Sequence, residues 1–392
     1  MYRHLFKLIW NKRKQNFLLM SEMLVSFLVL FAVFTLLVYY YQNYKKPMGF
    51  DYEHVWVINY SNGNKLSNGD SLNLFYETLK REIRAMPEVR DISLSSSNTP
   101  FSHATIQNGF KYKGKMTENV NAYRIDDSYK NVLQLKILEG HWFSKADAVN
   151  GTVPIVINSS LKEMVFGKEQ VIGKIIGDDE YKRQIIGVVA DAKYDGDYMP
   201  SGFASFSRVD TSSIHWMDKL LVRVNADAGP AFEGRLYKKV AGYIESSNVE
   251  IEHLIDKRKS INYFALVPMI VLSIVSCFLI INVALGLFGV LWYNINRRRG
   301  EIGLRRAIGA TGKSVAGQLV IEAMILATFS LIIGAFFAIQ FPLLNVFDLP
   351  ASVYITALVL SVIFIYLLVL VCAFYPGRQA AAIYPAVALH EE

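Results

Sequence analysis

The segment AIGATGKS, Ala307 to Ser314, has the spacing of a phosphate-binding loop, in which a run opened by Ala or Gly ends in Gly-Lys-Ser. Such a loop works because a buried strand delivers a glycine-rich turn whose amides surround phosphate at the N-terminus of a helix. A nucleotide site also needs an acidic residue at the end of an apolar strand to hold magnesium. The elements around the segment therefore decide whether ATP chemistry is possible here.

The elements around this segment do not fit a phosphate-binding loop. The preceding residues, RRRGEIGLRRAIGA, are charged and helical in spacing, and an apolar helix is predicted to follow. The best magnesium candidate, Asp191 in IIGVVADA, lies on the other side of the membrane in the topology derived below. The cytoplasmic segments are also far shorter than the ~100 residues of a folded domain. We therefore expect no cofactor, metal or catalytic site in this chain.

The composition indicates a membrane protein. Of the 392 residues, 52% are hydrophobic and 19% are charged, which is more apolar than a typical soluble protein. Four apolar runs are long enough to cross a bilayer, which takes about 20 helical residues. They are residues 17–41, 262–292, 315–341 and 352–374. The first run resembles a signal peptide in its basic start, but it is too long and has no small-residue cleavage site, so we interpret it as an uncleaved anchor.

Basic residues mark one side of these spans. They are Arg3, Lys7, Lys12, Arg13, Lys14, Arg297, Arg298, Arg299, Arg305, Arg306, Lys313 and Arg378. Because cytoplasmic segments are enriched in Lys and Arg, we expect residues 1–16, 293–314 and 375–392 to be cytoplasmic. Residues 42–261 and the short link 342–351 are then outside. The net charge of +7 reflects this topology and contact with lipid headgroups, and it does not indicate nucleic-acid binding.

Residues 42–261 are predicted to form a folded α+β domain. Two strand–helix–strand patterns, which begin with HVWVINY and KLLVRVNA, flank a strand-rich insertion of about 97–213. This order predicts a split ferredoxin-like porter lobe with an inserted β-rich lobe. The expected fold class is thus four transmembrane helices plus an α+β extracytoplasmic domain.

Polar residues in this domain give little sign of chemistry. The histidines are scattered without metal-ligand spacing, and both cysteines, Cys277 and Cys372, lie in predicted spans, so no disulfide is expected outside. The acidic pairs that begin at Asp126 and Asp178 are interpreted as solvated turn residues, because Asp favours turns.

The basic segment between the second and third spans has an unusual helical pattern. Four residues recur on one side of a helix from 297 to 310, and apolar residues lie on the neighbouring faces. The first set is Arg298, Glu301, Arg305 and Gly309, and the second is Ile302, Leu304 and Ile308. Two interpretations remain open: an interfacial helix whose basic side chains reach lipid headgroups, or a helix that docks on a partner.

Glu322 lies about two turns into the third span, where a carboxylate is costly and is a candidate for function. Alternatively, its position near the cytoplasmic interface allows it to reach that interface or to pair with Arg305 or Arg306.

The run RRRGEIGLRRAIGATGKSVAGQLVIEAMIL resembles the signature of the FtsX-like, MacB-type permeases of ABC transporters, with a permease domain of about 265–387. LQLKILEGHWFS, VPIVINSSLKEMVFG and IIGVVADAKYD are similar to segments of the MacB-type periplasmic core domain, and YPGRQAAAIYPAVALHEE is similar to the family's tail. His141, Lys313 and His390 depart from the family pattern. None of these departures affects the core from Glu301 to Ala310.

The resemblance implies a permease subunit that binds no ATP itself. Two such permeases, identical or related, would recruit cytoplasmic ABC ATPase subunits that bind ATP and Mg²⁺. A coupling helix would sit on the ATPase and move the outer domain by mechanotransmission, without substrate necessarily crossing this membrane. Its residues would be Arg298, Glu301, Ile302, Arg305, Arg306, Ala307 and Gly309.

The family also implies a location and a set of further partners. The chain would lie in a bacterial inner membrane with its large domain in the periplasm. Further partners can include a periplasmic adaptor and an outer-membrane channel. Export or efflux is the leading role. Activation of a partner such as a cell-wall hydrolase, or extraction of lipoprotein or lipid, stays open.

Overall fold

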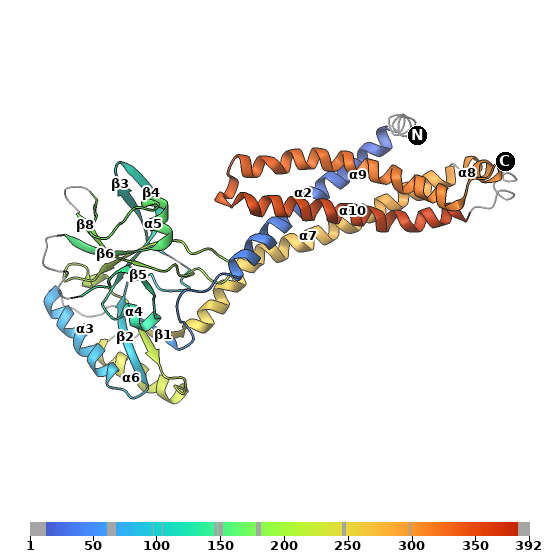
Figure 1. Cartoon of the computed structure of the whole chain (residues 1–392). Helices are drawn as coiled ribbons and strands as arrows, with labels where there is room; N and C mark the ends of the chain where they lie inside the picture. Colours follow the sequence, from blue (N-terminus) through green and yellow to red (C-terminus); the bar gives the residue numbers. More distant parts are fainter. Residues whose placement is uncertain are drawn as a thin grey trace. The chain divides into compact units, whose positions relative to one another are not determined.

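The computed structural model describes residues 13–60, 68–96, 98–103, 105–144, 147, 152–177, 182–244, 248–297 and 299–382. The chain divides into two compact units. One, here called the membrane unit, combines the residues up to Gln42 with those from Leu266 onward, and the other, the α+β domain, is Asn43–Ala265. Figure 1 shows the helices of the first and the mixed sheet of the second.

Four long helices carry the apolar runs. They are α2 (Arg13–Tyr44), α7 (Leu254–Arg297), α9 (Gly312–Leu343) and α10 (Ala351–Ala381). Each contains an 18-residue stretch apolar enough to cross a membrane. The helices extend beyond the predicted runs because polar turns continue them. The clearest case is α7, which begins at Leu254 and not at 262.

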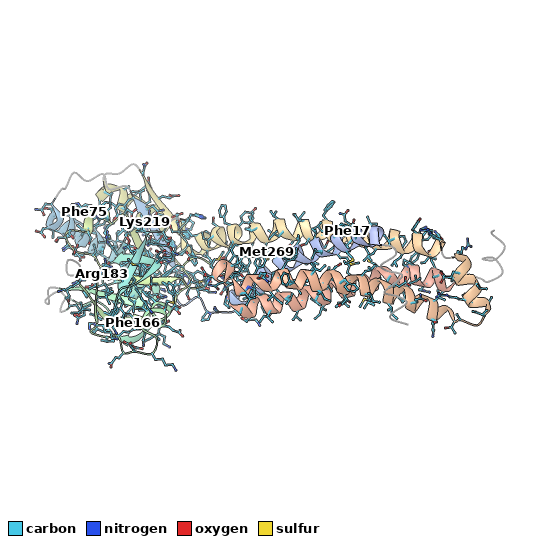
Figure 2. The ribbon with its side chains drawn as sticks, turned by 90° about the horizontal axis from the view of Figure 1, so that it is seen from above. Phe17, Phe75, Phe166, Arg183, Lys219 and Met269 are labelled. Carbon is cyan, nitrogen blue, oxygen red and sulfur yellow. The ribbon has the colours of Figure 1, made fainter. Side chains whose placement is uncertain are left out.

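The membrane unit has an apolar core and an apolar surface. Its core receives side chains from all four long helices, among them Phe27, Leu287, Ala327 and Ile365. Other large apolar side chains face outward, such as Phe17, which is exposed and is labelled in Figure 2. This arrangement suits lipid, where helices satisfy their own backbone groups and no polar face is needed.

The α+β domain is built on one mixed sheet of eleven strands. Its strands are β1 (Val55–Tyr60), β2 (Val89–Ser95), β3 (Gln107–Tyr112), β4 (Lys115–Ile125), β5 (Ile137–Gly140), β6 (Val153–Asn158), β7 (Ile175–Ile176), β8 (Arg183–Val189), β9 (Phe203–Arg208), β10 (Lys219–Val224) and β11 (Val249–His253). The order is β11-β1-β10-β2-β4-β9-β6-β8-β5, with β3 on β4 and β7 on β8.

Both predicted strand–helix–strand patterns are present, as β1-α3-β2 and β10-α6-β11. Their four strands interleave, and each neighbouring pair is antiparallel. Helices α3 (Gly69–Arg84) and α6 (Pro230–Ile244) lie side by side on one face of these strands (Figure 1). Helical spacing explains the packing of α3, because Leu72, Tyr76 and Leu79 recur on its buried face.

The insertion is strand-rich, as predicted, and also contains α4 (Tyr129–Leu133) and α5 (Ser159–Phe166). Its strands belong to the same sheet as β1, β2, β10 and β11 and do not form a separate one. Among the described residues, the ladder between β2 and β4 is one residue pair long, Ser95 opposite Ile125. Figure 2 labels Phe75 and Lys219 on one side of this seam and Phe166 and Arg183 on the other.

The prediction that Asp126 is a solvated turn residue is wrong. Asp126 is buried beside the seam, and its carboxylate accepts hydrogen bonds from Lys80 Nζ at 2.8 Å, Ser93 Oγ at 2.6 Å and Leu94 N at 3.1 Å. Burial opposes charge on Lys80, but the Asp126 and Glu77 carboxylates outweigh it, so the pKa of Lys80 is raised. The other acidic pair, at Asp178, lies outside the described residues.

Replacing Asp126 by alanine leaves the buried Lys80 ammonium without its main counter-charge, which typically costs about 3–5 kcal/mol. We expect a loss of that order in the free energy of unfolding of the α+β domain. Urea denaturation of the full chain, followed by the fluorescence of the buried Trp56 and Trp142, measures it. The control Glu77→Ala removes the exposed partner of the same lysine, so it should cost less than about 1 kcal/mol. Equal losses would contradict the assignment.

Candidate coupling site

A short helix, α8 (Arg299–Ala307), lies between α7 and α9 in the chain. The prediction that this helix includes Gly309 and Ala310 is wrong. The helix ends at Ala307, and Gly309 has a backbone φ of +105°, a conformation that side-chain-bearing residues rarely adopt. The Ala310 amide then donates to the Arg305 carbonyl at 2.9 Å. Gly309 therefore ends the helix and turns the chain toward α9.

The AIGATGKS segment is thus a helix–turn–helix and not a strand–turn–helix. Residues 299–314, all of which are described, contain no strand. The Thr311 side chain caps α9 by accepting from the Ser314 amide, and Lys313 is exposed in the first turn of α9. The segment therefore has the local geometry of a helix connection and not that of a phosphate-binding loop.

One face of α8 is fixed to the membrane unit by apolar packing. Ile302 is 6% exposed. It belongs to a small cluster with Ile295 of α7, Val315 and Leu319 of α9, and Ala380 of α10. This cluster therefore holds α8 against all three helices.

Polar contacts reinforce this attachment. Arg306 Nη1 donates to the Ala381 carbonyl at the end of α10, at 2.6 Å, as cations near a helix C-terminus commonly do. Arg305 Nη2 lies 2.5 Å from Glu301 Oε1 one turn earlier. The two side chains are 38% and 44% exposed, so we expect the pair to contribute only a few tenths of a kcal/mol.

Glu322 is connected to α8 through a residue that the sequence analysis did not identify. Arg305 Nη1 donates to Gln318 Oε1 at 2.9 Å, and Gln318 Nε2 donates to Glu322 Oε1 at 3.1 Å. The expected pairing of Glu322 with an α8 arginine thus takes the form of a bridge through Gln318. The available signal was the spacing: Gln318 lies one helical turn before Glu322, on the same face of α9.

The opposite face of α8 presents apolar side chains to its surroundings. Leu304 is 54% exposed and Ile308, just past the helix, is 79% exposed. Glu301 and Ala307 are also exposed. Arg298 lies outside the described residues. The site thus combines an anchored face with an open face of mixed apolar and charged residues, a composition suited to docking.

The two isoleucines provide a matched test of this arrangement. Ile302→Ala removes buried methyl groups, which typically costs about 2–5 kcal/mol, and should lower the unfolding temperature of the purified full chain. Ile308→Ala is the control, because an exposed substitution usually changes stability by less than about 0.5 kcal/mol. A scanning calorimetry or thermal-shift experiment compares them. Equal effects would mean that α8 is not anchored through Ile302.

Two family models match the chain. The model described as MacB-like periplasmic core domain matches residues 17–233, more than half of the 392 residues, and the model described as FtsX-like permease C-terminal matches residues 273–385. The second match contains α8, Gln318 and Glu322.

Individual relatives are distant. The chain is 24% identical over 264 residues to the macrolide export ATP-binding/permease protein MacB of Aggregatibacter actinomycetemcomitans, which covers 62% of this chain and 40% of that protein. It is 22% identical over 294 residues to the uncharacterized ABC transporter permease YvrN of Bacillus subtilis (strain 168), with coverage of 69% and 70%. The periplasmic region of MacB from Actinobacillus actinomycetemcomitans aligns with a TM-score of 0.39 and 15% identity, over 53% of this chain and 92% of that structure.

The chain spans less than half the length of the MacB proteins it matches. The first match covers most of α2 and the α+β domain as far as the start of α6, and the second covers α8, α9, α10 and the part of α7 from residue 273 onward. The chain therefore belongs to the FtsX-like permeases of the ABC transporter family that carry a MacB-like periplasmic core domain.

Proposed function

We propose that this chain couples ATP hydrolysis in a separate cytoplasmic ATPase to movement of its α+β domain, and that α8 is the element that contacts the ATPase. The observation that carries this proposal is the two-sided structure of α8. One face is anchored through Ile302 to three helices, and the other exposes Leu304 and Ile308. A helix that serves as a lever needs both a partner surface and a rigid attachment.

The attachment gives a physical path for the movement. When the ATPase closes on ATP and Mg²⁺, it would displace the open face of α8. The Ile302 cluster and the Arg306 contact with α10 would carry that displacement into α7, α9 and α10. Helix α7 then continues to Leu254, which follows β11 directly. Through α7, the ATPase would thus perform work on the α+β domain, provided that the contacts of α8 differ between the two states of the ATPase.

The charge pattern supports the proposed topology. The basic residues near α8 favour a cytoplasmic position for it and for both termini, with the α+β domain on the periplasmic side. The permease would act as a pair, either two copies or one copy with a related chain, surrounded by membrane lipid and without nucleic acid. ATP and Mg²⁺ would bind to the ATPase and not to this chain.

Export is the role that we favour, because curated relatives are named for macrolide export. Those relatives are more than twice as long as the matched region, so this chain would depend on other subunits for the remaining functions. Purification of the complex separates the outcomes. An adaptor or outer-membrane channel would support export, whereas a cell-wall hydrolase or a lipoprotein would support regulation or extraction.

A charge reversal tests the docking role of α8. Glu301→Lys combined with Arg305→Glu preserves an i,i+4 ion pair within the helix but reverses the charges offered to a partner. We expect normal folding and a loss of ATPase binding of at least about tenfold, which corresponds to 1.4 kcal/mol. Co-purification and ATPase stimulation measure it. Unchanged binding and stimulation would remove α8 from the interface.

Lys313 tests where ATP is bound. Because Lys313 lies in the first turn of α9 after a helix connection, Lys313→Ala should leave the ATPase activity of the complex within about twofold of wild type, an effect below 1 kcal/mol. The purified chain alone should hydrolyse no ATP. Hydrolysis by the isolated chain that disappears in Lys313→Ala would refute the assignment of ATP to a partner.

A further inference from the structure

One loop of the α+β domain contacts the ends of two membrane helices. This loop, Asp191–Tyr198, follows β8 and is here called the clasp loop. The last residues of α2, Asn43 and Tyr44, and the first twelve residues of α7 belong to the same compact domain as the loop. The contacts described below therefore lie within one folded body.

The clasp loop binds α7 through Asp197. The Asp197 carboxylate accepts two hydrogen bonds from Arg258, from Nε at 2.9 Å and from Nη2 at 2.7 Å, and a third from Asn262 Nδ2 at 3.0 Å. The Asp197 amide donates to Asn262 Oδ1 at 2.9 Å. Two-pronged contacts between arginine and carboxylate fix orientation as well as distance. The Arg258 guanidinium also lies over the Tyr52 ring, 4.6 Å from its centre.

The same loop binds the end of α2 through Lys193. Lys193 Nζ donates to the Asn43 carbonyl at 2.9 Å and to the Asp197 carbonyl at 3.1 Å. Asn43 Nδ2 in turn donates to the Tyr198 carbonyl at 3.2 Å, and the rings of Tyr44 and Tyr198 stack with their centres 5.9 Å apart. Lys193 thus connects α2 to the residue that holds α7.

The approach of the loop to α7 requires a residue without a side chain. Gly196 has a φ of +98°, and a Cβ placed on it would lie 2.6 Å from Asn262 Oδ1 and 2.6 Å from Ile261 Cγ2. Either feature alone disfavours any other residue here. The backbone of the clasp loop is therefore shaped to lie directly on α7.

Two of the four charged residues of the clasp loop, Lys193 and Asp197, are buried at a cost. Lys193 is 3% exposed and Asp197 is 5% exposed. Burial lowers the pKa of Lys193, and the Asp197 carboxylate opposes this. Apolar residues of similar volume often stabilise a buried position at least as well as an ion pair does. We attribute the presence of charged residues here to their directional hydrogen bonds. Such bonds fix the orientation of a helix, whereas apolar contact does not.

We propose that Lys193 and Asp197 are positioning residues that lock α2 and α7 to each other at the base of the α+β domain, so that the two helices drive the domain as one element. The inference rests on the proposed function only for the source of the movement. The lock itself is a property of the resting protein and can be tested without ATP.

Amide hydrogen exchange of the full chain in nanodiscs tests the lock. For each variant, exchange is measured at the helix whose own contacts the substitution leaves in place. Lys193→Met removes the side-chain contact to α2, and exchange is read in residues 254–265 of α7. Asn262→Ala, a change in α7 itself, removes contacts of α7 with the clasp loop without leaving a buried charge. Its exchange is read in residues 43–48, which contain the end of α2 and the chain that follows it. We expect exchange to rise by about fivefold or more at the distant helix in both variants.

A matched control removes a polar pair from the same part of α7. Asp256 Oδ1 accepts from Lys259 Nζ at 2.8 Å, with both side chains exposed. Asp256→Asn should therefore leave exchange in residues 43–48 unchanged. If Lys193→Met and Asn262→Ala raise exchange only at the helix that lost its own contact, the helices are held independently and the proposal is wrong.

A second experiment separates the lock in the resting protein from its role in ATP-driven movement of the α+β domain. ATP added to the complex with its ATPase should change exchange in the α+β domain of the wild type, and Asp197→Asn should abolish that change although the variant remains folded by circular dichroism. A residue with a merely structural role would lower the melting temperature and leave the ATP-dependent change intact, which would overturn the proposal. If the wild type shows no ATP-dependent change, the proposed function is wrong, and the resting-state exchange still decides the lock.

Discussion

The apolar contact of Ile302 with α7, α9 and α10 is the interaction on which the proposed coupling depends. In a bilayer, helices gain little from hydrophobic association with one another, because lipid is as apolar as they are. The cluster around Ile302 is different, since it lies at the ends of the helices beside a charged segment. There, apolar contact can be favoured over water, and it fixes α8 where the lipid-facing stretches would not.

Paired charges occupy the other junctions of the chain. Asp126 joins α3 to the seam in the sheet, and Asp197 joins the clasp loop to α7. In the membrane unit, Arg305 reaches Glu322 through Gln318. Burial makes the Asp126 and Asp197 contacts sensitive to loss of a partner. Apolar packing builds the elements themselves, and the joints between them rely on directional polar contacts.

Residue periodicity predicted the elements well. Long apolar runs defined the four membrane helices, and alternating strand and helix patterns predicted both strand–helix–strand patterns. The failures occurred where distant segments meet. The turn at Gly309 ended a helix that spacing alone would have continued, and Asp126 was assigned to solvent because its lysine lies 46 residues away.

The candidate site was predicted in part. Ile302 and Arg305 came from helical spacing together with the family resemblance, and Arg306 came from the resemblance alone. The structure places all three in contact with neighbouring helices. Gln318 was missed because a single glutamine in an apolar helix has no distinctive pattern. Lys193 was missed because the atoms it binds are main-chain carbonyls, which have no signature in the residue types. Asp197 was missed because its side-chain partners, Arg258 and Asn262, lie 61 and 65 residues away.

The seam between β2 and β4 has a mechanical consequence. Strand pairing there is limited to Ser95 opposite Ile125, but one apolar core continues across the seam, with Val57 and Leu221 on one side and Tyr123 and Phe206 on the other. The Asp126 carboxylate, which binds Lys80 of α3, adds a polar contact beside it. Side-chain packing, more than the backbone ladder, therefore transmits force across this line of the sheet.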